Sequence, residues 1–147
     1  MISPGRRSKS TRGGALVEFS LMIFLLIMVI LVTVEIDRMF LVYTTVCNAA
    51  RAGARYAVVH GGLRTGSGVN GQSGPGNTTQ VETVVKNFAS VGLLDTGKLN
   101  IAVSYPQGNL PGSAVVVTVT YPYDPFVSWF TQLAVNLGST TRGVISY

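Results

Sequence analysis

The sequence is short, apolar and poor in charge, and its positive charge is concentrated at one end. Of its 147 residues, 47% are hydrophobic and 12% charged, against about 25% charged residues in an ordinary soluble domain. This length predicts one domain, or one small domain with an appendage. Four of the eleven basic residues precede Gly13, which leaves seven basic against six acidic residues after it. A basic tail beside an apolar run is typical of a membrane-topology signal, so we expect no nucleic-acid partner.

The chemistry-bearing residues exclude several kinds of site. Cys47 is the one cysteine, which excludes an intramolecular disulfide framework and a cysteine-rich zinc site. His60 is the one histidine, so a single chain cannot form a two-histidine metal site. The string GSGVNG at 66–71 has G-x-G-x-x-G spacing but lacks the preceding strand that a dinucleotide-binding loop requires. We therefore predict no enzymatic activity, no metal and no cofactor.

Residues 14–34 are predicted to form a transmembrane helix. They include twelve uninterrupted apolar residues, LMIFLLIMVILV at 21–32. At about 1.5 Å per residue, about 20 residues cross a hydrocarbon core of about 30 Å. A secretory signal has a shorter apolar region and a small-x-small cleavage site, which the following VEIDRMF does not offer. The basic residues before the span, and the net negative EIDR segment after it, place the N-terminus in the cytoplasm and the remainder outside.

The helix is expected to continue outside the membrane over residues 35–60. This segment has no proline, and Gly53 is its one glycine before Gly61–Gly62. One face carries small residues that another helix could approach closely, although a plain alanine-rich surface is the alternative. These residues are Ala49, Ala50, Gly53, Ala54 and Ala57. Arg51 and Arg55 are like charges at i, i+4, which favours acids or carbonyls on a partner element.

A glycine-rich loop is predicted over residues 61–77. Seven of its seventeen residues are glycine, which favours a flexible excursion on the surface. We expect His60, which directly precedes this loop, to be a solvated residue at the end of the helix.

Residues 78–147 are predicted to form a small α+β domain. Thr79 and Glu82 have capping-box spacing at the start of a helix that Gly92 would end. LNIAVSY at 99–105 and AVVVTVTYPY at 114–123 predict an antiparallel hairpin. FVSWFTQLAV at 126–135 is compatible with an amphipathic helix, and STTRGVISY at 139–147 with a further strand. The fold class is thus α+β, with a long N-terminal helix, a second helix and an antiparallel sheet.

Aromatic residues cluster towards the end of this domain. They could form a belt at a membrane interface, but we expect them to pack in the core or between subunits instead. The cluster consists of Tyr121, Tyr123, Phe126, Trp129 and Phe130.

Glu18 is the one acid inside the apolar span. A carboxylate in a membrane segment is costly and usually marks a function that involves a partner group. The alternative is a chance acid near the helix end that reaches the cytoplasmic headgroups. We favour the functional interpretation.

These features together resemble a known family. The string RGGALVEFSLMIFLLIMVILVTVEIDRMFLVYTTVCNAARAGARYAVV is similar to the N-terminal region of TadE-like minor pilins (pseudopilins) of the bacterial tight-adherence (Flp, type IVb) pilus machinery. The family pattern has basic residues, a glycine, four residues, and then Glu followed by Tyr or Phe. Gly13, Glu18 and Phe19 fit this pattern.

A second block supports the same resemblance. The family has an acid and an arginine just past the membrane, followed by Asn-Ala-Ala-Arg-x-Gly-Ala-Arg-Tyr-Ala. Glu35 and Arg38 fit the first part, and residues 48–57 fit the second. Asp37 departs from the pattern, because relatives often have glycine there.

The resemblance implies processing and assembly. A prepilin peptidase would remove residues 1–13 by cutting after Gly13, with a cut after Gly14 as the second possibility. The cut would create an amine four residues from Glu18, whose carboxylate would pair with the amine of a neighbouring subunit and set the axial stagger. In a low-dielectric setting, both charged groups require such a partner.

The resemblance also implies partners and a location. The partners would be the prepilin peptidase, other major and minor pilins, the inner-membrane pilus assembly platform and the lipid bilayer. The protein would cross the inner membrane once, with its C-terminal domain outside, or enter the pilus. The alternative function is an uncleaved bitopic membrane anchor that carries a small envelope-exposed binding domain.

Overall fold

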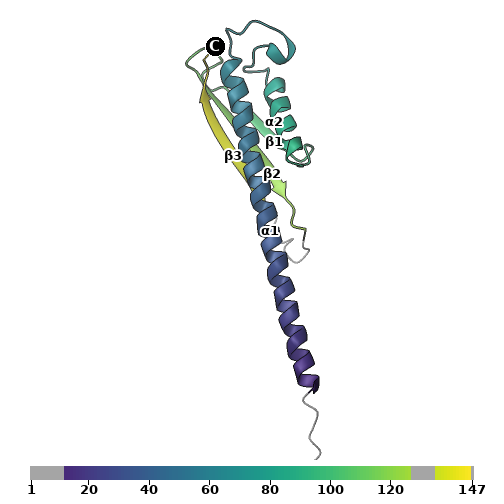
Figure 1. The fold of residues 1–147 in the computed structure, drawn as a ribbon. Helices are drawn as coiled ribbons and strands as arrows, with labels where there is room; N and C mark the ends of the chain where they lie inside the picture. Colours follow the sequence, from purple (N-terminus) through teal and green to yellow (C-terminus); the bar gives the residue numbers. More distant parts are fainter. Residues whose placement is uncertain (1–11, 127–134, 147) are drawn as a thin grey trace, which may run out of the picture.

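The fold consists of one long helix with a small α+β domain packed on its distal half (Figure 1). The computed structural model describes residues 12–126 and 135–146. Its elements are α1 (Arg12–Val59), a short 3-10 helix η1 (Gly68–Asn70), α2 (Thr79–Val91), β1 (Asn100–Ser104), β2 (Ala114–Tyr123) and β3 (Val135–Val144). The predicted α+β class is confirmed.

Helix α1 is continuous over 48 residues. At about 1.5 Å per residue it is about 72 Å long. No proline occurs within it, and it ends at Val59, close to the predicted stop at Gly61–Gly62. Its most apolar window has a mean hydropathy of 2.9, and none of that window is buried in the described structure. The helix is therefore long and apolar enough to cross a membrane.

The three strands form one antiparallel sheet in the order β1-β2-β3. β1 and β2 pair from Asn100↔Thr120 to Ser104↔Val116, which confirms the predicted hairpin. β3 pairs with β2 along its full length and is longer than the strand predicted at 139–147. The amphipathic helix predicted over 126–135 falls mainly on 127–134, outside the described residues, and its last residue, Val135, begins β3.

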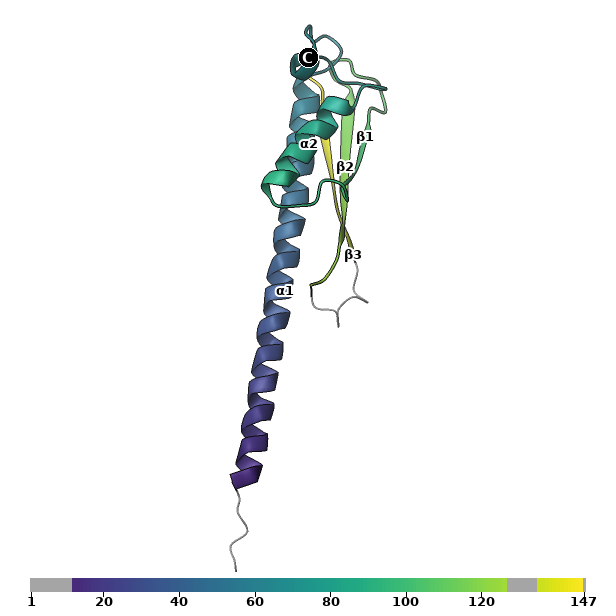
Figure 2. The same ribbon diagram turned by 90° about the vertical axis from the view of Figure 1, so that its right-hand side faces the viewer.

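Both helices cover the same face of the sheet (Figure 2). The alternating side chains of Val115, Val117 and Val119 in β2 are fully buried against the helices. The intervening residues of β2, such as Thr118, are only half-buried on the opposite face. Period-two alternation thus produces a sheet with one packed face and one open face.

The small-residue face of α1 packs inside its own chain. Ala49, Ala50 and Ala57 are fully buried and Ala54 is 3% exposed. At Gly53, a Cβ atom would lie 2.5 Å from Val85 Cγ2 of α2 and 3.4 Å from Val117 Cγ1 of β2. The absence of a side chain at Gly53 therefore lets α2 and the sheet approach the α1 backbone closely.

The start of α2 differs from the predicted capping box. The N-cap is Thr78 rather than Thr79, and its hydroxyl donates to the Glu82 carboxylate at 2.7 Å instead of accepting from a backbone N–H. The physical reason is that Thr78 has nearly helical dihedrals (φ −100°, ψ −8°). An N-cap side chain reaches the backbone of the first turn from the extended region.

The end of α2 is a Schellman motif with leucine in the left-handed position. Gly92 follows the last helical residue as predicted, but the positive φ of 59° belongs to Leu93. The N–H groups of Leu93 and Leu94 donate to the carbonyls of Ser90 and Ala89, at 3.1 and 3.2 Å. Gly92 itself serves close packing, because a Cβ there would collide with the side chain of Thr45 in α1.

Hydrogen bonds tie the glycine-rich loop to the domain at Gly62, Val69 and Ser73. The Tyr56 hydroxyl donates to the Val69 carbonyl at 2.7 Å, and the Ser73 N–H donates to the His60 carbonyl at 2.6 Å. Ser73 is buried and also accepts a hydrogen bond from the Tyr105 hydroxyl at 3.0 Å. The expectation that His60 is solvated is wrong. Its ring stacks on Tyr56 with centroids 3.9 Å apart and is 8% exposed, because the returning loop covers it.

A bulky residue at Gly53 should destabilise the domain. We expect Gly53→Val to lower the free energy of unfolding by about 1–3 kcal/mol, because it forces α1 away from Val85. Thermal or denaturant unfolding of the full chain in detergent micelles measures this change. Asn48→Val is the matched control, because it adds the same β-branched residue at an exposed position of the same helix. Equal stabilities of the two variants would contradict the close-approach argument.

Candidate functional site

The first turns of α1 contain the predicted processing boundary. Gly13 and Gly14 are helical and exposed, and a Cβ atom at either position would have no neighbour within 4 Å. The described fold therefore leaves this peptide bond uncovered by other elements.

Glu18 lies one helical turn beyond Gly14 and differs from the other polar residues of the span. The hydroxyls of Ser20 and Thr33 donate to the carbonyls of Val17 and Val29, at 2.8 and 2.9 Å, and are thus satisfied within the helix. Glu18 is exposed and makes no hydrogen bond or ion pair with the described residues. In a membrane its carboxylate would need a partner from outside this part of the chain.

Apolar side chains surround Glu18 along residues 13–34, which we call the free half of α1. Phe19, the neighbour singled out by sequence, is 62% exposed. Leu16, Phe24 and Leu26 are also more than half exposed. No element of the described domain covers this stretch, so its apolar surface is available to lipid or to other helices.

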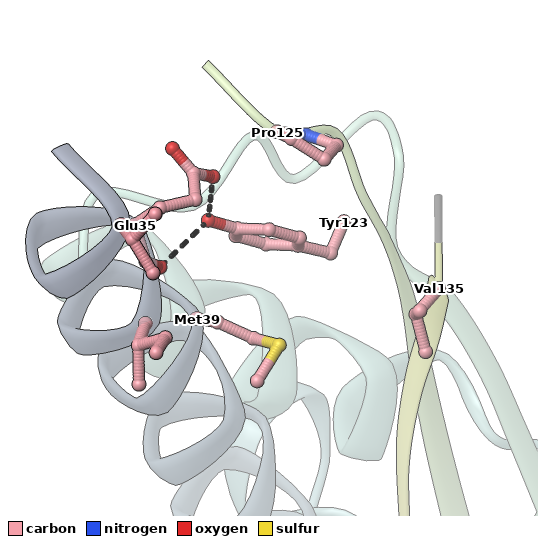
Figure 3. Close-up of a pocket in the computed structure, with 7 residues that line it drawn as sticks. Glu35, Met39, Tyr123, Pro125 and Val135 are labelled. Carbon is pink, nitrogen blue, oxygen red and sulfur yellow. Dashed lines mark hydrogen bonds between the residues drawn. The ribbon is translucent and has the colours of Figure 1, made fainter. Parts of the chain in front are cut away.

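The second polar group of α1 joins the helix to the end of β2 (Figure 3). The Tyr123 hydroxyl donates to the Glu35 carboxylate and also lies 3.3 Å from the Glu35 backbone carbonyl. The same carboxylate accepts a hydrogen bond from the backbone N–H of Phe126 at 3.2 Å. We call this group, Glu35 with Tyr123 and the Phe126 N–H, the Glu35 clasp. The Glu35 side chain is only 13% exposed, so its acid is largely shielded by its own chain.

Arg38 adds weaker contacts to the Glu35 clasp. Its guanidinium lies 4.0 Å from the Glu35 carboxylate and 3.5 Å from the Asp124 carbonyl. It also lies over the Tyr123 ring, with its central carbon 5.5 Å from the ring centroid. Because the Arg38 side chain is about half exposed, we assign it a smaller share of the stabilisation than the buried hydroxyl.

The environment of Tyr123 keeps its hydroxyl protonated. Burial of the phenol, followed by its hydrogen bond to the Glu35 carboxylate, raises the pKa of Tyr123 to about 12. The hydroxyl therefore remains a hydrogen-bond donor across the physiological range.

The other two predicted polar residues lie elsewhere. Arg51 and Arg55 are exposed on α1 and form no ion pair with the described residues. Sequence reasoning identified Glu35 and Arg38 but missed Tyr123 as their partner. The alternation of β2 does place Tyr123 on the same face as Val119, towards the helix, but it does not say which turn of α1 the tyrosine meets.

An apolar hollow of about 350 Å³ lies beside the Glu35 clasp, between α1, the C-terminal end of β2 and the N-terminal end of β3 (Figure 3). Its lining consists of Val32, Glu35, Ile36, Met39, Tyr123, Pro125 and Val135. Within the described ranges, no three His, Cys, Asp or Glu side chains are grouped as a metal site would require.

Comparison with known proteins identifies a family match over most of α1. Residues 13–55 match the family model TadE, described as TadE-like protein. This segment is TadE-like. The match confirms the resemblance inferred from the sequence. It includes Gly13, Glu18 and Phe19 of the first block, and the second block as far as Arg55. It ends within α1, so α2 and the sheet lie beyond the TadE-like segment. No curated protein and no solved structure matches the chain.

Removal of the Tyr123 hydroxyl should loosen the Glu35 clasp. A hydrogen bond to a charged group contributes about 1.5–3 kcal/mol, so Tyr123→Phe should lower the free energy of unfolding by a similar amount at neutral pH. Tyr121→Phe, at a half-buried position with no side-chain hydrogen bond among the described residues, is the control and should have little effect.

The difference in the free energy of unfolding between wild type and Tyr123→Phe should depend on pH. Since the pKa of Tyr123 is raised to about 12 in the folded state, its stabilising contribution is complete below the ordinary tyrosine pKa of 10.0. The difference between wild type and Tyr123→Phe should therefore shrink as the pH rises from 10 through about 12. A difference that is constant with pH, measured by chemical denaturation, would argue against a buried protonated hydroxyl.

Proposed function

We propose that this TadE-like protein is a membrane-anchored minor pilin, or pseudopilin, that supports assembly of a Tad-type (type IVb) pilus used in adherence. The observation that carries the proposal is the TadE-like segment at 13–55, within which Glu18 has no partner among the described residues. The proposed role is structural rather than enzymatic.

The proposed topology follows from the exposed half of α1. Residues 14–34 would cross the inner membrane, with the N-terminus in the cytoplasm and the α+β domain outside. Such a span is about 31 Å long, which matches the hydrocarbon core. Its end coincides with Glu35, where α1 first makes polar contacts with the rest of the chain.

The proposed processing step is a cut after Gly13 by a prepilin peptidase on the cytoplasmic side. The boundary lies at the open end of α1, which supports access by the peptidase. The cut would leave an α-amine on Gly14, and the Glu18 carboxylate would pair with this amine on a neighbouring subunit. Both groups would otherwise be buried in lipid without a counter-charge.

Contacts with other pilins and with the assembly platform would use the exposed sides of α1. The small-residue face is already occupied by α2 and the sheet, so it is not available to a neighbouring subunit. Two exposed features remain on this helix. They are the apolar surface around Glu18, and the cationic pair Arg51 and Arg55, which suits acids or carbonyls on a neighbour.

Processing is the direct test of this proposal. Co-expression of the full chain with a prepilin peptidase should produce a shorter protein whose N-terminal sequence begins at Gly14. Gly13→Leu should remain uncut, because a bulky residue would occupy the position before the cleaved bond. Gly14→Ala, the matched control on the other side of that bond, should still be cut.

Two results would contradict this assignment. A wild-type chain that stays full length would instead support the uncleaved bitopic anchor with an envelope-exposed binding domain. A chain cut beyond Val34 would show that the apolar run is a removed signal. N-terminal sequencing and intact mass distinguish these outcomes.

Glu18→Ala tests the pairing role separately. We expect the variant to insert in the membrane normally, because it removes a charge from an apolar span. Pilus assembly should fall severalfold or stop, since the loss of one partner from a desolvated ion pair costs about 3–5 kcal/mol. Ser20→Ala is the control, because that hydroxyl is satisfied within the helix. Membrane extraction and counts of pili by electron microscopy measure the two properties, and normal piliation in Glu18→Ala would rule out the pairing role.

A further inference from the structure

Both ends of the β2–β3 connection lie beside the middle of α1. The Phe126 N–H donates to the Glu35 carboxylate at 3.2 Å. On the other strand, Val135 lines the same apolar hollow as Val32 and Ile36. The lower ends of β2 and β3 reach this level in both ribbon views (Figures 1 and 2). The sheet therefore extends down to the last turns of the proposed membrane span.

The described residues at this level are apolar and exposed. Phe126 is 85% exposed, so it does not pack in the core of its own chain as one expectation for the aromatic cluster had it. Val135 is 45% exposed and Ile36 is 47% exposed. Together we call these three residues the apolar tip. Val32, one turn before Ile36 within the proposed span, lines the same hollow as Ile36 and Val135, so the apolar tip adjoins the span. Large apolar side chains exposed in continuity with a membrane helix favour contact with lipid rather than with water.

The composition of the connection is consistent with such a contact. None of the ten residues 126–135, FVSWFTQLAV, is charged, although the preceding residue pair is Asp124–Pro125.

We propose that this protein contacts the bilayer twice. One contact is the span in α1, and the other is the apolar tip, which lies in the headgroup layer of the same membrane, on the side that carries the α+β domain. The inference rests on the proposed span at 14–34, but not on cleavage or on pilus assembly. Ile36 is two residues, or about 3 Å, beyond Val34, and the headgroup layer extends about 5–7 Å beyond the hydrocarbon core. The partner of the tip is therefore a lipid surface.

The Glu35 clasp acquires a further role at this boundary. A carboxylate at the edge of a bilayer loses part of its hydration, which is costly unless other donors replace water. Glu35 receives donors from Tyr123 and from the Phe126 backbone, both on the segment that carries the tip. The same contacts that satisfy the acid thus hold Phe126 of the tip beside α1.

Site-specific labelling tests the lipid contact in the full chain. In a Cys47→Ala background, Phe126→Cys carries an environment-sensitive bimane label in vesicles whose acyl chains are brominated. We expect its emission to be blue-shifted and quenched severalfold more than that of a label at Leu110→Cys. Leu110 is 60% exposed and lies at the distal end of the domain, where the carbonyl of its neighbour Asn109 accepts from the Gly62 N–H.

Ile36→Cys provides the reference for the membrane span. Quenching at positions 36 and 126, but not at 110, supports the second contact. Quenching at 36 alone overturns the second contact and leaves the span intact, whereas no quenching at 36 overturns the proposed span as well. The measurement is repeated in nanodiscs that hold one chain each. A blue shift of the label at position 126 that is seen in protein-rich vesicles but is lost in the single-chain nanodiscs would identify a neighbouring subunit as the partner and overturn the lipid assignment.

Discussion

The close approach of α1 to its own domain is the constraint on which the rest of the structure depends. Gly53 and the neighbouring alanines leave little between the α1 backbone and the valines of α2 and β2. Gly92 likewise allows the end of α2 to approach α1 closely. Gly143 allows the same for β3, because a Cβ there would lie 2.5 Å from Val58 Cγ2. A core built mainly of valine and alanine is thin, so backbones rather than large side chains meet across it. One side of α1 thereby packs against the domain, and its other sides stay exposed in the described structure.

The fold treats the two acids of α1 in opposite ways. Glu35 finds its donors within the chain, from residues that follow it by about ninety positions, so its contacts form once when the domain folds. Glu18 has no such donor among the described residues, although it lies in the more costly environment of the proposed span. A carboxylate that is hydrogen-bonded within its own chain stabilises the fold. A carboxylate without such bonds needs a donor from another molecule when it is removed from water. The difference between these two carboxylates separates the structural part of the helix from the part proposed to act in assembly.

Much of the architecture could be predicted from local patterns. The apolar run and the absence of proline predicted α1, and alternation with a turn predicted the β1–β2 hairpin. The small-residue face was also visible, but spacing at i, i+4 describes a surface and does not identify what covers it. The Tyr123–Glu35 contact depends on how the sheet is placed along the helix, which no local pattern contains. His60 and Leu93 were missed for a related reason: a returning loop buries the first, and close packing at Gly92 leaves the left-handed position to the second.

The unbroken helix between the proposed span and the domain has a geometric consequence. With neither proline nor glycine between Val34 and Val42, the first buried valine of the core, no joint separates the two regions. Each residue of an α-helix advances about 1.5 Å and turns about 100°. An insertion of a single residue directly before Glu35 would leave the Glu35 clasp and the core in register but would rotate the domain, relative to the proposed span, by more than a quarter turn about the helix axis. The position of Glu35 in the helix, counted from the proposed span, therefore sets the direction in which the open face of the sheet points around the axis of α1.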